Sequence, residues 1–243
     1  MPQNIYDDPE FFAEYSRLRR SRHGLDGAPE WPAVRELLPD LTGKRVVDLG
    51  CGFGWFSRWA RENGAEQVVG YDLSHNMLQR ARQDTPDEGV EYVLANLESL
   101  ELPVASFDLA YSSLALHYIE DLARLVRTVY RALTPGGRFV FTMEHPIFTA
   151  PASPEWVRGP DGRKGWRLTQ YAVEGERTPH WLGADVVKYH RTMGTILQAL
   201  IDAGFRLQAV RDWSPAEKQL EELPLLSEEL ERPMILIVSA ARE

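Results

Sequence analysis

The segment 48–54 begins with an acidic residue and carries glycine at every second position after Leu49; it reads Asp48, Leu49, Gly50, Cys51, Gly52, Phe53, Gly54. Glycines let a backbone turn tightly and approach a ligand closely, because they lack a Cβ atom. A helix that begins after such a turn offers free N–H groups. The spacing places Trp55 where a dinucleotide-binding fingerprint has its third glycine, and Asp48 would repel a diphosphate. The turn therefore favours a ligand other than a pyrophosphate.

A second acidic residue, Asp72, ends the next predicted strand, 24 residues after Asp48. An acid at the end of that strand can accept hydrogen bonds from both ribose hydroxyls of an adenosine that lies across the crevice. Asp48 is then left to face a cationic ammonium group, directly or through water. The two acids together predict a ligand with a ribose at one end and a positive charge at the other.

Histidines are the candidate bases, because imidazole titrates near neutral pH and can remove a hydroxyl proton. His117 follows the fourth predicted strand, His145 follows the fifth, and His190 stands at the opening of a late helix. Ligands bind at the carboxyl ends of parallel strands, which places the first two beside the ligand. We expect His145 or His190 to assist catalysis and His117 to pack near the cofactor.

The hydrophobic pattern predicts the scaffold that positions these residues. Short apolar runs predict seven strands, at residues 45–50, 67–72, 90–94, 107–112, 138–143, 205–210 and 234–240. Apolar residues at helical spacing lie between them, most clearly over residues 119–133, and Ser74 is a good N-cap for a helix through residue 82. Strands that alternate with helices at short intervals predict an α/β fold, with a doubly wound, mostly parallel sheet.

Residues 144–190 interrupt this pattern, since Pro and Gly are frequent there and no period is visible. A disordered linker would be poor in aromatic residues, but this segment contains Trp156, Trp166 and Trp181. We predict an ordered substrate cap, in which the tryptophans form either simple core or an aromatic cage. The acidic stretch 217–231 is typical of a solvated helical or loop face.

Four segments, in order and at normal spacing, resemble the class I S-adenosylmethionine-dependent methyltransferases of the small-molecule type. Residues 46–54 resemble the first motif of the family, residues 70–78 the second, residues 106–118 the fourth-strand segment, and residues 133–139 the turn before strand five. The resemblance implies a Rossmann-like fold and S-adenosylmethionine as methyl donor, with S-adenosylhomocysteine as product. It also implies transfer of the methyl group to an oxygen or nitrogen of a small-molecule acceptor by in-line displacement.

The same resemblance implies one domain with four parts, at residues 1–42 (helical arm), 43–143 (cofactor-binding core), 144–190 (cap) and 191–243 (closing helix and strands). Family members often carry an aspartate after strand three for the adenine amine; Asn96 stands there and can accept that hydrogen bond. The arm often folds over the cofactor, so Tyr15 or Arg20 would meet the amino-acid carboxylate. The predicted cofactor-binding residues are Tyr15, Arg20, Asp48, Gly50, Cys51, Gly52, Phe53, Gly54, Asp72, Leu73, Ser74, Met77, Asn96, Leu97, Glu98, Ser112, Ser113 and His117.

Composition limits the partners that we expect. Asp and Glu outnumber Lys and Arg by 36 to 27, and a net charge of -9 weighs against nucleic-acid binding. The single cysteine excludes a disulfide framework within the chain, and no metal-ligand cluster stands out. No signal peptide or membrane-length apolar run is visible, which predicts a cytoplasmic protein without a membrane partner. We expect this protein to be a monomer or a homodimer.

Two other functions stay open at this point. One is a nicotinamide-dependent oxidoreductase, against which the glycine spacing and Asp48 both argue. The other is a non-catalytic S-adenosylmethionine-binding regulator, which would release no S-adenosylhomocysteine when given a metabolite extract. The sulfonium is already a good leaving group, so alignment of the acceptor and exclusion of water are the main catalytic tasks.

Overall fold

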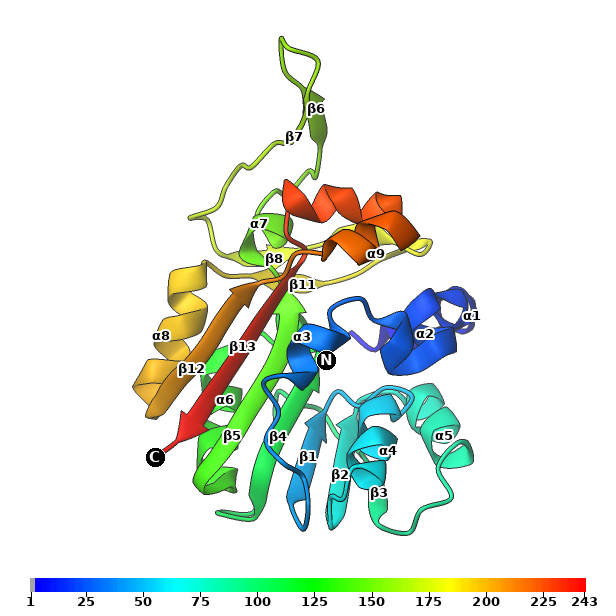
Figure 1. Ribbon diagram of the computed structural model, residues 1–243, viewed down its shortest axis with the longest axis vertical. Coiled ribbons are helices and arrows are strands. Elements are labelled where there is room, and N and C mark those ends of the chain that lie inside the picture. Colours follow the sequence, from blue (N-terminus) through cyan, green and yellow to red (C-terminus); the bar gives the residue numbers. More distant parts are fainter. Residues whose placement is uncertain (1–2) are drawn as a thin grey trace.

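One seven-stranded sheet forms the centre of the computed structural model, which describes residues 3–243 (Figure 1). Its strand order is β12-β13-β5-β4-β1-β2-β3. The parallel strands of the core are β1 (Arg45–Leu49), β2 (Gln67–Asp72), β3 (Val90–Leu94), β4 (Phe107–Ser113) and β5 (Leu133–Glu144). Strand β13 (Ile235–Arg242) runs antiparallel to both of its neighbours, β5 and β12 (Phe205–Asp212). The predicted seven-stranded, mostly parallel sheet is confirmed.

The direction in which the sheet grows reverses beside β1. The chain first adds β2 and β3 on one side of β1, and then returns to add β4 and β5 on the other side. In open α/β sheets, ligands bind at the carboxyl ends of the strands where the order reverses. The glycine turn that follows β1 therefore lies where such a fold binds its ligand.

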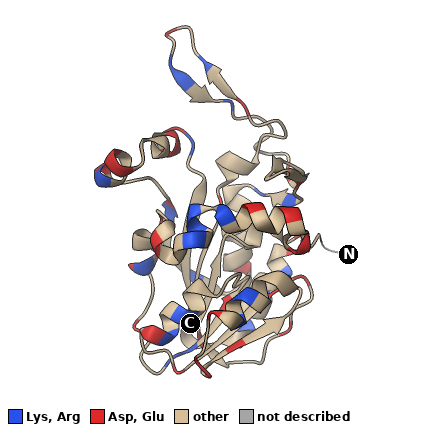
Figure 2. Ribbon diagram, turned by 90° about the vertical axis from the view of Figure 1, so that its right-hand side faces the viewer, with Lys and Arg blue, Asp and Glu red and all other residues tan. Residues whose placement is uncertain are grey.

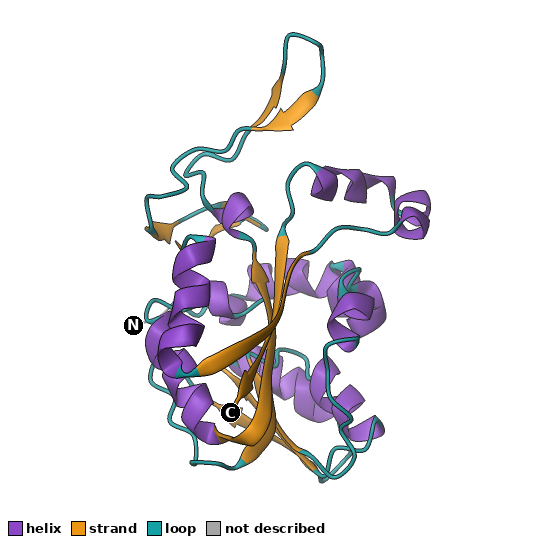
Figure 3. Ribbon diagram, turned by 60° about the vertical axis from the view of Figure 1, so that its left-hand side comes forward, coloured by secondary structure: helices purple, strands orange, loops and turns teal. Residues whose placement is uncertain are grey.

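Helices cover both faces of the sheet, as the edge-on view in Figure 3 shows. Helices α6 (Leu122–Ala132) and α8 (Met193–Ala203) pack on one face with Val47 of β1. Helices α3 (Trp31–Arg35) and α4 (Trp55–Glu62) pack on the other face with Val46. The side chains of these adjacent valines thus pack against the helices on opposite faces of the sheet, as the alternation of side chains in a strand requires. Helix α5 (His75–Gln83) packs against β2 and β3.

Short-range signals set the ends of these helices. Oγ of Ser74 accepts the backbone N–H of Met77 at 3.1 Å, so the predicted N-cap of α5 is present. Asp121 and Thr192 cap α6 and α8 in the same manner. Gly204 ends α8 in the left-handed conformation, with a φ of 100°, which glycine adopts without a steric penalty.

An N-terminal arm precedes the sheet and lies beside its carboxyl edge. The arm contains a 3-10 turn (Ile5–Asp7), α1 (Pro9–Arg17), α2 (Arg19–His23) and a second 3-10 turn (Gly24–Gly27), after which α3 follows. Asp7 reaches the start of α5, where its carboxylate accepts hydrogen bonds from Ser74 and from the backbone N–H of Asn76. This contact attaches the arm to the end of β2.

The segment 144–190 is ordered and folds over the same edge of the sheet. It contains α7 (Pro146–Thr149) and three two-stranded sheets. These sheets pair β6 (Trp156–Arg158) with β7 (Lys164–Trp166), β8 (Gly175–Arg177) with β11 (Lys188–His190), and β9 (His180–Trp181) with β10 (Ala184–Asp185). The β6–β7 hairpin projects away from the body of the protein (Figures 1 and 3). His190 lies on β11 and not at the start of α8, which begins three residues later at Met193.

The acidic stretch contains α9 (Glu217–Glu222) and a 3-10 helix (Pro224–Leu230), and one of its acids, Glu229, is buried. Figure 2 shows that basic and acidic residues are interspersed over the helices and the projecting hairpin. Within residues 3–243, no helix combines the length and the apolar character that a membrane crossing requires.

Candidate active site

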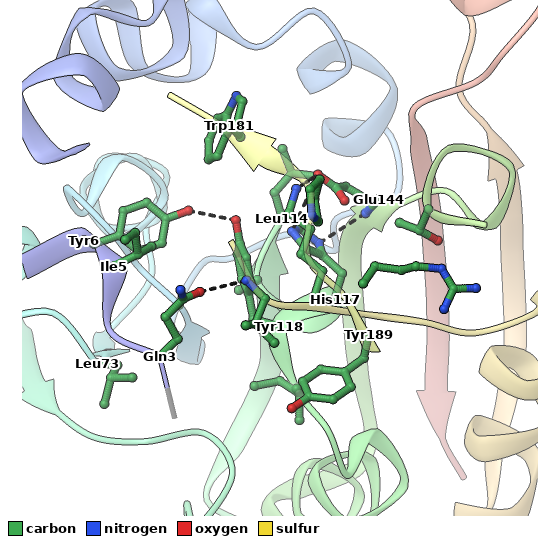
Figure 4. Close-up of a pocket in the computed structure, with 18 of the residues that line it drawn as sticks. Gln3, Ile5, Tyr6, Leu73, Leu114, His117, Tyr118, Glu144, Trp181 and Tyr189 are labelled. Atoms are coloured by element: carbon green, nitrogen blue, oxygen red, sulfur yellow. Dashed lines mark hydrogen bonds and ion pairs between the residues drawn. The ribbon is translucent and has the colours of Figure 1, made fainter. Parts of the chain in front are cut away.

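A cavity of about 990 Å³ lies over the carboxyl ends of the central strands, between the N-terminal arm and the cap (Figure 4). Its wall includes the glycine turn after β1, the end of β2, residues 96–98, and the ends of β4 and β5. Pockets that hold one drug-sized ligand measure about 300–1,000 Å³. This cavity is at the upper end of that range, so its volume suits one large ligand or two smaller ones.

The end of β2 and the glycine turn are joined through Asp72. Oδ2 of Asp72 accepts the backbone N–H of Gly52 at 2.8 Å, and Oδ1 accepts the backbone N–H of Ser74 at 2.9 Å. Burial raises the pKa of the Asp72 carboxyl, while these backbone hydrogen bonds act in the opposite direction. The carboxylate lines the cavity in a fixed orientation.

The glycine turn also depends on close packing. Gly50 has a φ of 76°, and a Cβ atom there would lie 2.4 Å from Cβ of Ala115. Gly54 has a φ of 72° and stands before α4; a Cβ atom there would lie 2.0 Å from the hydroxyl of Tyr92. Both positions therefore require glycine for backbone conformation and for space.

Most of the predicted cofactor-binding residues lie in the wall of this cavity. They are Tyr15, Arg20, Gly50, Gly52, Asp72, Leu73, Ser74, Met77, Asn96, Leu97, Glu98, Ser113 and His117. They come from the arm, from the ends of β1, β2, β3 and β4, and from the loops that follow these strands. The topology thus brings together residues that are far apart in the sequence.

Five predicted residues lie behind the wall, among the residues that the structure describes: Asp48, Cys51, Phe53, Gly54 and Ser112. Ser112 is buried, and its hydroxyl donates to the carbonyl of Leu49 at 2.7 Å. The side chain of Cys51 packs against Gly70 and Tyr92. Ser112 and Cys51 thus pack behind the turn, and the contact of all five residues with a ligand stays a prediction.

Asp48 is buried directly behind the turn. Its Oδ2 accepts the hydroxyl of Ser57 at 2.7 Å. Burial raises the pKa of the Asp48 carboxyl to about 7; the Ser57 hydrogen bond opposes this shift and the nearby charge of Asp72 adds to it. The side chain therefore titrates near neutral pH instead of near 4.

His145 lies outside the lining of the cavity in the described part of the chain. Its Nδ1 accepts the backbone N–H of Ile147 at 3.0 Å, so that it caps α7. Nε2 consequently carries the proton and donates to Oδ1 of Asp212 at 2.8 Å. Both ring nitrogens are occupied, and the geometry gives His145 no access to a substrate in the cavity.

His190 is also absent from the lining, within residues 3–243, and its side chain is buried inside the cap. Nε2 donates to the backbone carbonyl of Tyr171 at 2.9 Å, and Nδ1 lies 2.8 Å from the hydroxyl of Thr149. Burial lowers the pKa of His190, which keeps the ring neutral. The structure thus brings neither proposed catalytic histidine to the cavity, and their catalytic role stays a prediction without geometric support.

His117, in contrast, does line the cavity. Its Nδ1 accepts the backbone N–H of Glu144 at 3.3 Å, which leaves the proton on Nε2. Burial lowers the pKa of His117 to about 4; the carboxylate of Glu144 opposes this shift, and the charges of Lys188 and Arg191 add to it. His117 is a neutral N–H donor near neutral pH.

A buried ion pair lies next to His117. Nζ of Lys188 lies 2.5 Å from Oε1 of Glu144, and both side chains line the cavity. The ammonium is also 5.3 Å from the ring centroid of Trp181 and 5.9 Å from that of Tyr118. Neither member of this pair belongs to a sequence motif that predicts the site, although Glu144 stands at the end of β5.

The arm closes one side of the cavity by direct contact with the cap, as Figure 4 shows. The side-chain amide of Gln3 donates to the carbonyl of Asp185 at 2.7 Å and accepts the backbone N–H of Val187 at 2.8 Å. Beside this contact, the hydroxyls of Tyr6 and Tyr118 lie 2.9 Å apart. No sequence motif marks Gln3 or Tyr6, because their partners lie far away in the chain.

Arg20 lines the cavity, and its positive charge is paired with the carboxylate of Glu30. Its Nη2 lies 2.6 Å from Oε1 of Glu30, whose side chain is buried. The ring of Tyr15 lies near Tyr6 and Trp181, and burial raises the pKa of its hydroxyl. No cluster of three or more metal-binding side chains is found in the described residues.

The fold and this site define a Rossmann-like protein of the class I methyltransferase type, with a cavity at the switch point of the sheet. A family model described as a methyltransferase domain matches residues 47–141. A crystal structure of an S-adenosylmethionine-dependent methyltransferase from Mesorhizobium loti is 58% identical, covers 90% of this chain and 100% of its own, and has a TM-score of 0.87. The chain belongs to the S-adenosylmethionine-dependent methyltransferases, and the predicted enzyme class and cofactor are confirmed.

Two further relatives extend this comparison. An uncharacterised protein of Haemophilus influenzae is 34% identical, with 98% of this chain and 97% of that protein covered. A malonyl-[acyl-carrier protein] O-methyltransferase of Enterobacter lignolyticus is 38% identical over 56% of this chain. The match spans only 49% of that second relative's length, so it does not define the acceptor of this enzyme.

Proposed function

We propose that this enzyme transfers the methyl group of S-adenosylmethionine to an oxygen atom of a small molecule that binds in the same cavity. The observation that carries this proposal is the extent of the cavity. It continues from the glycine turn and Asp72 to Glu144, Phe148 and the cap, so it has space for an acceptor beside the cofactor. The choice of oxygen is supported by the O-methyltransferase relative, which is similar over about half of its length.

The residues in the wall fit the parts of the cofactor. Asp72 is placed to accept the ribose hydroxyls, because its oxygens keep further lone pairs beyond those used by Gly52 and Ser74. Asn96 would meet the adenine amine, and Tyr15 or Arg20 the amino-acid end. The bound cofactor supplies an activated methyl group on a sulfonium, which is a good leaving group.

The protein contributes alignment and a dry cavity. Holding two reactants in line can supply about 7–11 kcal/mol of a reaction barrier in ideal cases. The contacts of Gln3 with the cap and of Tyr6 with Tyr118 close the cavity over the reactants. We propose that the arm, residues 1–42, and the cap, residues 144–190, act together as this cover.

A small molecule fits the site better than a nucleic acid. The cavity is covered by two chain segments, and the net charge of -9 disfavours a polyanionic substrate. We therefore expect the acceptor to enter the cavity as a whole molecule.

The test is a turnover assay with a metabolite extract and S-adenosylmethionine that carries an isotope-labelled methyl group. We expect S-adenosylhomocysteine to form and the label to appear in an O-methyl product identified by mass spectrometry. The same mixture without enzyme gives the background. A labelled N-methyl product would overturn the choice of oxygen, and no S-adenosylhomocysteine above that background would overturn the proposed function.

A further inference from the structure

The ion pair of Glu144 and Lys188 is unusual because it is buried in the wall of a binding cavity. The side chains are 13% and 7% exposed, respectively. Removal of two charges from water costs several kcal/mol per ion, and replacement of such pairs by apolar residues is often neutral or stabilising. Stability alone therefore does not account for this pair, and its position at the end of β5 places it on the acceptor side of the cofactor.

The hydrogen bonds of the pair are incomplete. An ammonium group has three donors, and Nζ of Lys188 makes one hydrogen bond, to Glu144, within the described residues. Oε2 of Glu144 is buried and has no hydrogen-bond partner among the described residues. An unpaired buried charged group is costly, so the pair is suited to a ligand that both donates and accepts a hydrogen bond.

The charges of the pair select the charge of that ligand. A carboxylate would bring a negative charge beside Glu144, and an ammonium would bring a positive charge beside Lys188. Either arrangement places like charges together in a site with little water to screen them. A neutral hydroxyl avoids both penalties, because it can donate to the carboxylate and accept from the ammonium.

The surroundings of the pair are aromatic. The rings of Trp181 and Tyr118 lie within 6 Å of the Lys188 ammonium and line the cavity, as does Tyr189 (Figure 4). Aromatic rings give flat apolar surfaces on which a planar ring packs by stacking or by edge contact. The polar pair and these rings together fit an aromatic ring that carries a hydroxyl.

We propose that the acceptor is a neutral phenol-type compound, that Glu144 takes its hydroxyl proton, and that Lys188 holds the resulting negative charge. This inference rests on the proposed function, because it names the acceptor class for the same site. In the step, the phenol O–H bond breaks and its proton moves to Glu144. The phenol oxygen then bonds to the methyl carbon as the carbon–sulfur bond breaks and its electron pair stays on sulfur. The products are an aryl methyl ether, a neutral thioether and a neutral Glu144.

The experiment compares three probes that share a benzene ring: phenol, benzoate and benzylamine. We measure S-adenosylhomocysteine release with each probe on the full chain. Phenol should react at least about tenfold faster than the two charged probes, which corresponds to about 1.4 kcal/mol. Benzoate or benzylamine as the preferred probe would overturn the proposal, and so would an absence of turnover with all three.

Variants test the roles of the two residues. Glu144→Gln should lower turnover with phenol by about 10²–10⁴-fold, the usual contribution of a general base. The affinity for S-adenosylmethionine, measured by calorimetry, should stay within about twofold, a difference of less than 1 kcal/mol. Glu228→Gln is the matched control, because Glu228 also pairs with a lysine, Lys164, but lies outside the lining of the cavity in the described residues, and it should leave turnover unchanged.

The single variant leaves Lys188 buried without its partner, which can prevent folding. The double variant Glu144→Gln with Lys188→Met removes that charge and should fold, bind the cofactor and lack turnover with phenol. Wild-type turnover in either folded variant would overturn the proposal. The extract assay separates this failure from that of the proposed function: a methyl ester product contradicts the phenol class but leaves O-methylation intact.

Discussion

Gly52 donates its backbone N–H to Oδ2 of Asp72 at 2.8 Å, and this hydrogen bond joins the turn after β1 to the end of β2. The second oxygen of Asp72 is held by the backbone N–H of Ser74 at 2.9 Å. Because both donors belong to the main chain, the carboxylate is oriented before any ligand arrives. Such preorganisation lowers the entropic cost of binding.

Asp72→Ala should weaken the binding of S-adenosylmethionine by about 2–4 kcal/mol, since it removes charge-assisted hydrogen bonds to two ribose hydroxyls. Isothermal calorimetry with S-adenosylmethionine and S-adenosylhomocysteine measures this loss. Asp84→Ala is the matched control, because Asp84 lies at the far end of α5, where it pairs with Arg80 on the surface. An unchanged dissociation constant for Asp72→Ala would contradict the ribose-binding role.

Gly52→Ala and Gly136→Ala form a matched pair of substitutions. Both glycines have a positive φ, 52° and 81° respectively, and a Cβ atom at either position meets nothing within 4 Å. Each alanine should therefore cost about 1–2 kcal/mol of unfolding free energy, the penalty for a left-handed backbone. Only Gly52 lines the cavity, so only its alanine should also weaken cofactor binding, by about tenfold or more. Equal affinities of the two variants for S-adenosylmethionine would contradict a close approach of the cofactor to Gly52, because they would show that the turn has space for a Cβ atom there.

His145→Ala and His190→Ala distinguish a catalytic from a structural histidine. The sequence-based hypothesis predicts lost turnover in at least one variant. The geometry predicts that His190→Ala lowers the unfolding free energy by about 1–3 kcal/mol, because the carbonyl of Tyr171 and the hydroxyl of Thr149 lose their partner. Urea unfolding and S-adenosylhomocysteine release measure the two effects. Lost turnover in a fully folded variant would restore the catalytic assignment.

The choice between Glu144 and His145 illustrates where sequence reasoning stops. The two residues are adjacent at the end of β5, and imidazole is the better base near neutral pH, which favours His145. Strand β5 ends at Glu144, however, and His145 is already the N-cap of α7. The structure places Glu144 in the cavity and His145 against Asp212. Which of the two side chains faces the cavity depends on how the cap folds over this edge of the sheet, and no local sequence pattern predicts that.

The core of the fold could be predicted because its signals are local. The bounds of β2 and β3 and the cap of α5 at Ser74 follow from apolar runs and one hydrogen-bonding side chain. The tryptophans of the cap could not be assigned in this manner. Trp156 and Trp166 pack on Arg232, with its guanidinium 5.2 and 5.0 Å from their rings, whereas Trp181 lines the cavity. The tryptophans thus belong partly to a structural cluster and partly to the site, and their partners lie in distant segments.

Asp48 should make the stability of the protein fall as the pH rises from about 4 to about 7. In the unfolded chain its carboxyl ionises near pH 4, whereas burial raises the pKa to about 7 in the folded protein. Between these values the folded state binds the additional proton, so the free energy of unfolding decreases with increasing pH. The full loss, reached above pH 7, is at most about 4 kcal/mol, since one pKa unit is worth about 1.4 kcal/mol.

Asp48→Asn keeps a hydrogen-bond acceptor for Ser57 but does not titrate, so this variant should lack that decrease. The comparison is made by urea unfolding of both proteins at pH 5 and pH 8. His117 changes the stability in the opposite direction, because burial lowers its pKa to about 4. Its contribution to the free energy of unfolding increases as the pH rises to the ordinary pKa of histidine, and both proteins share this contribution. Identical pH profiles for the two proteins would show that the Asp48 carboxyl keeps its ordinary pKa behind the glycine turn.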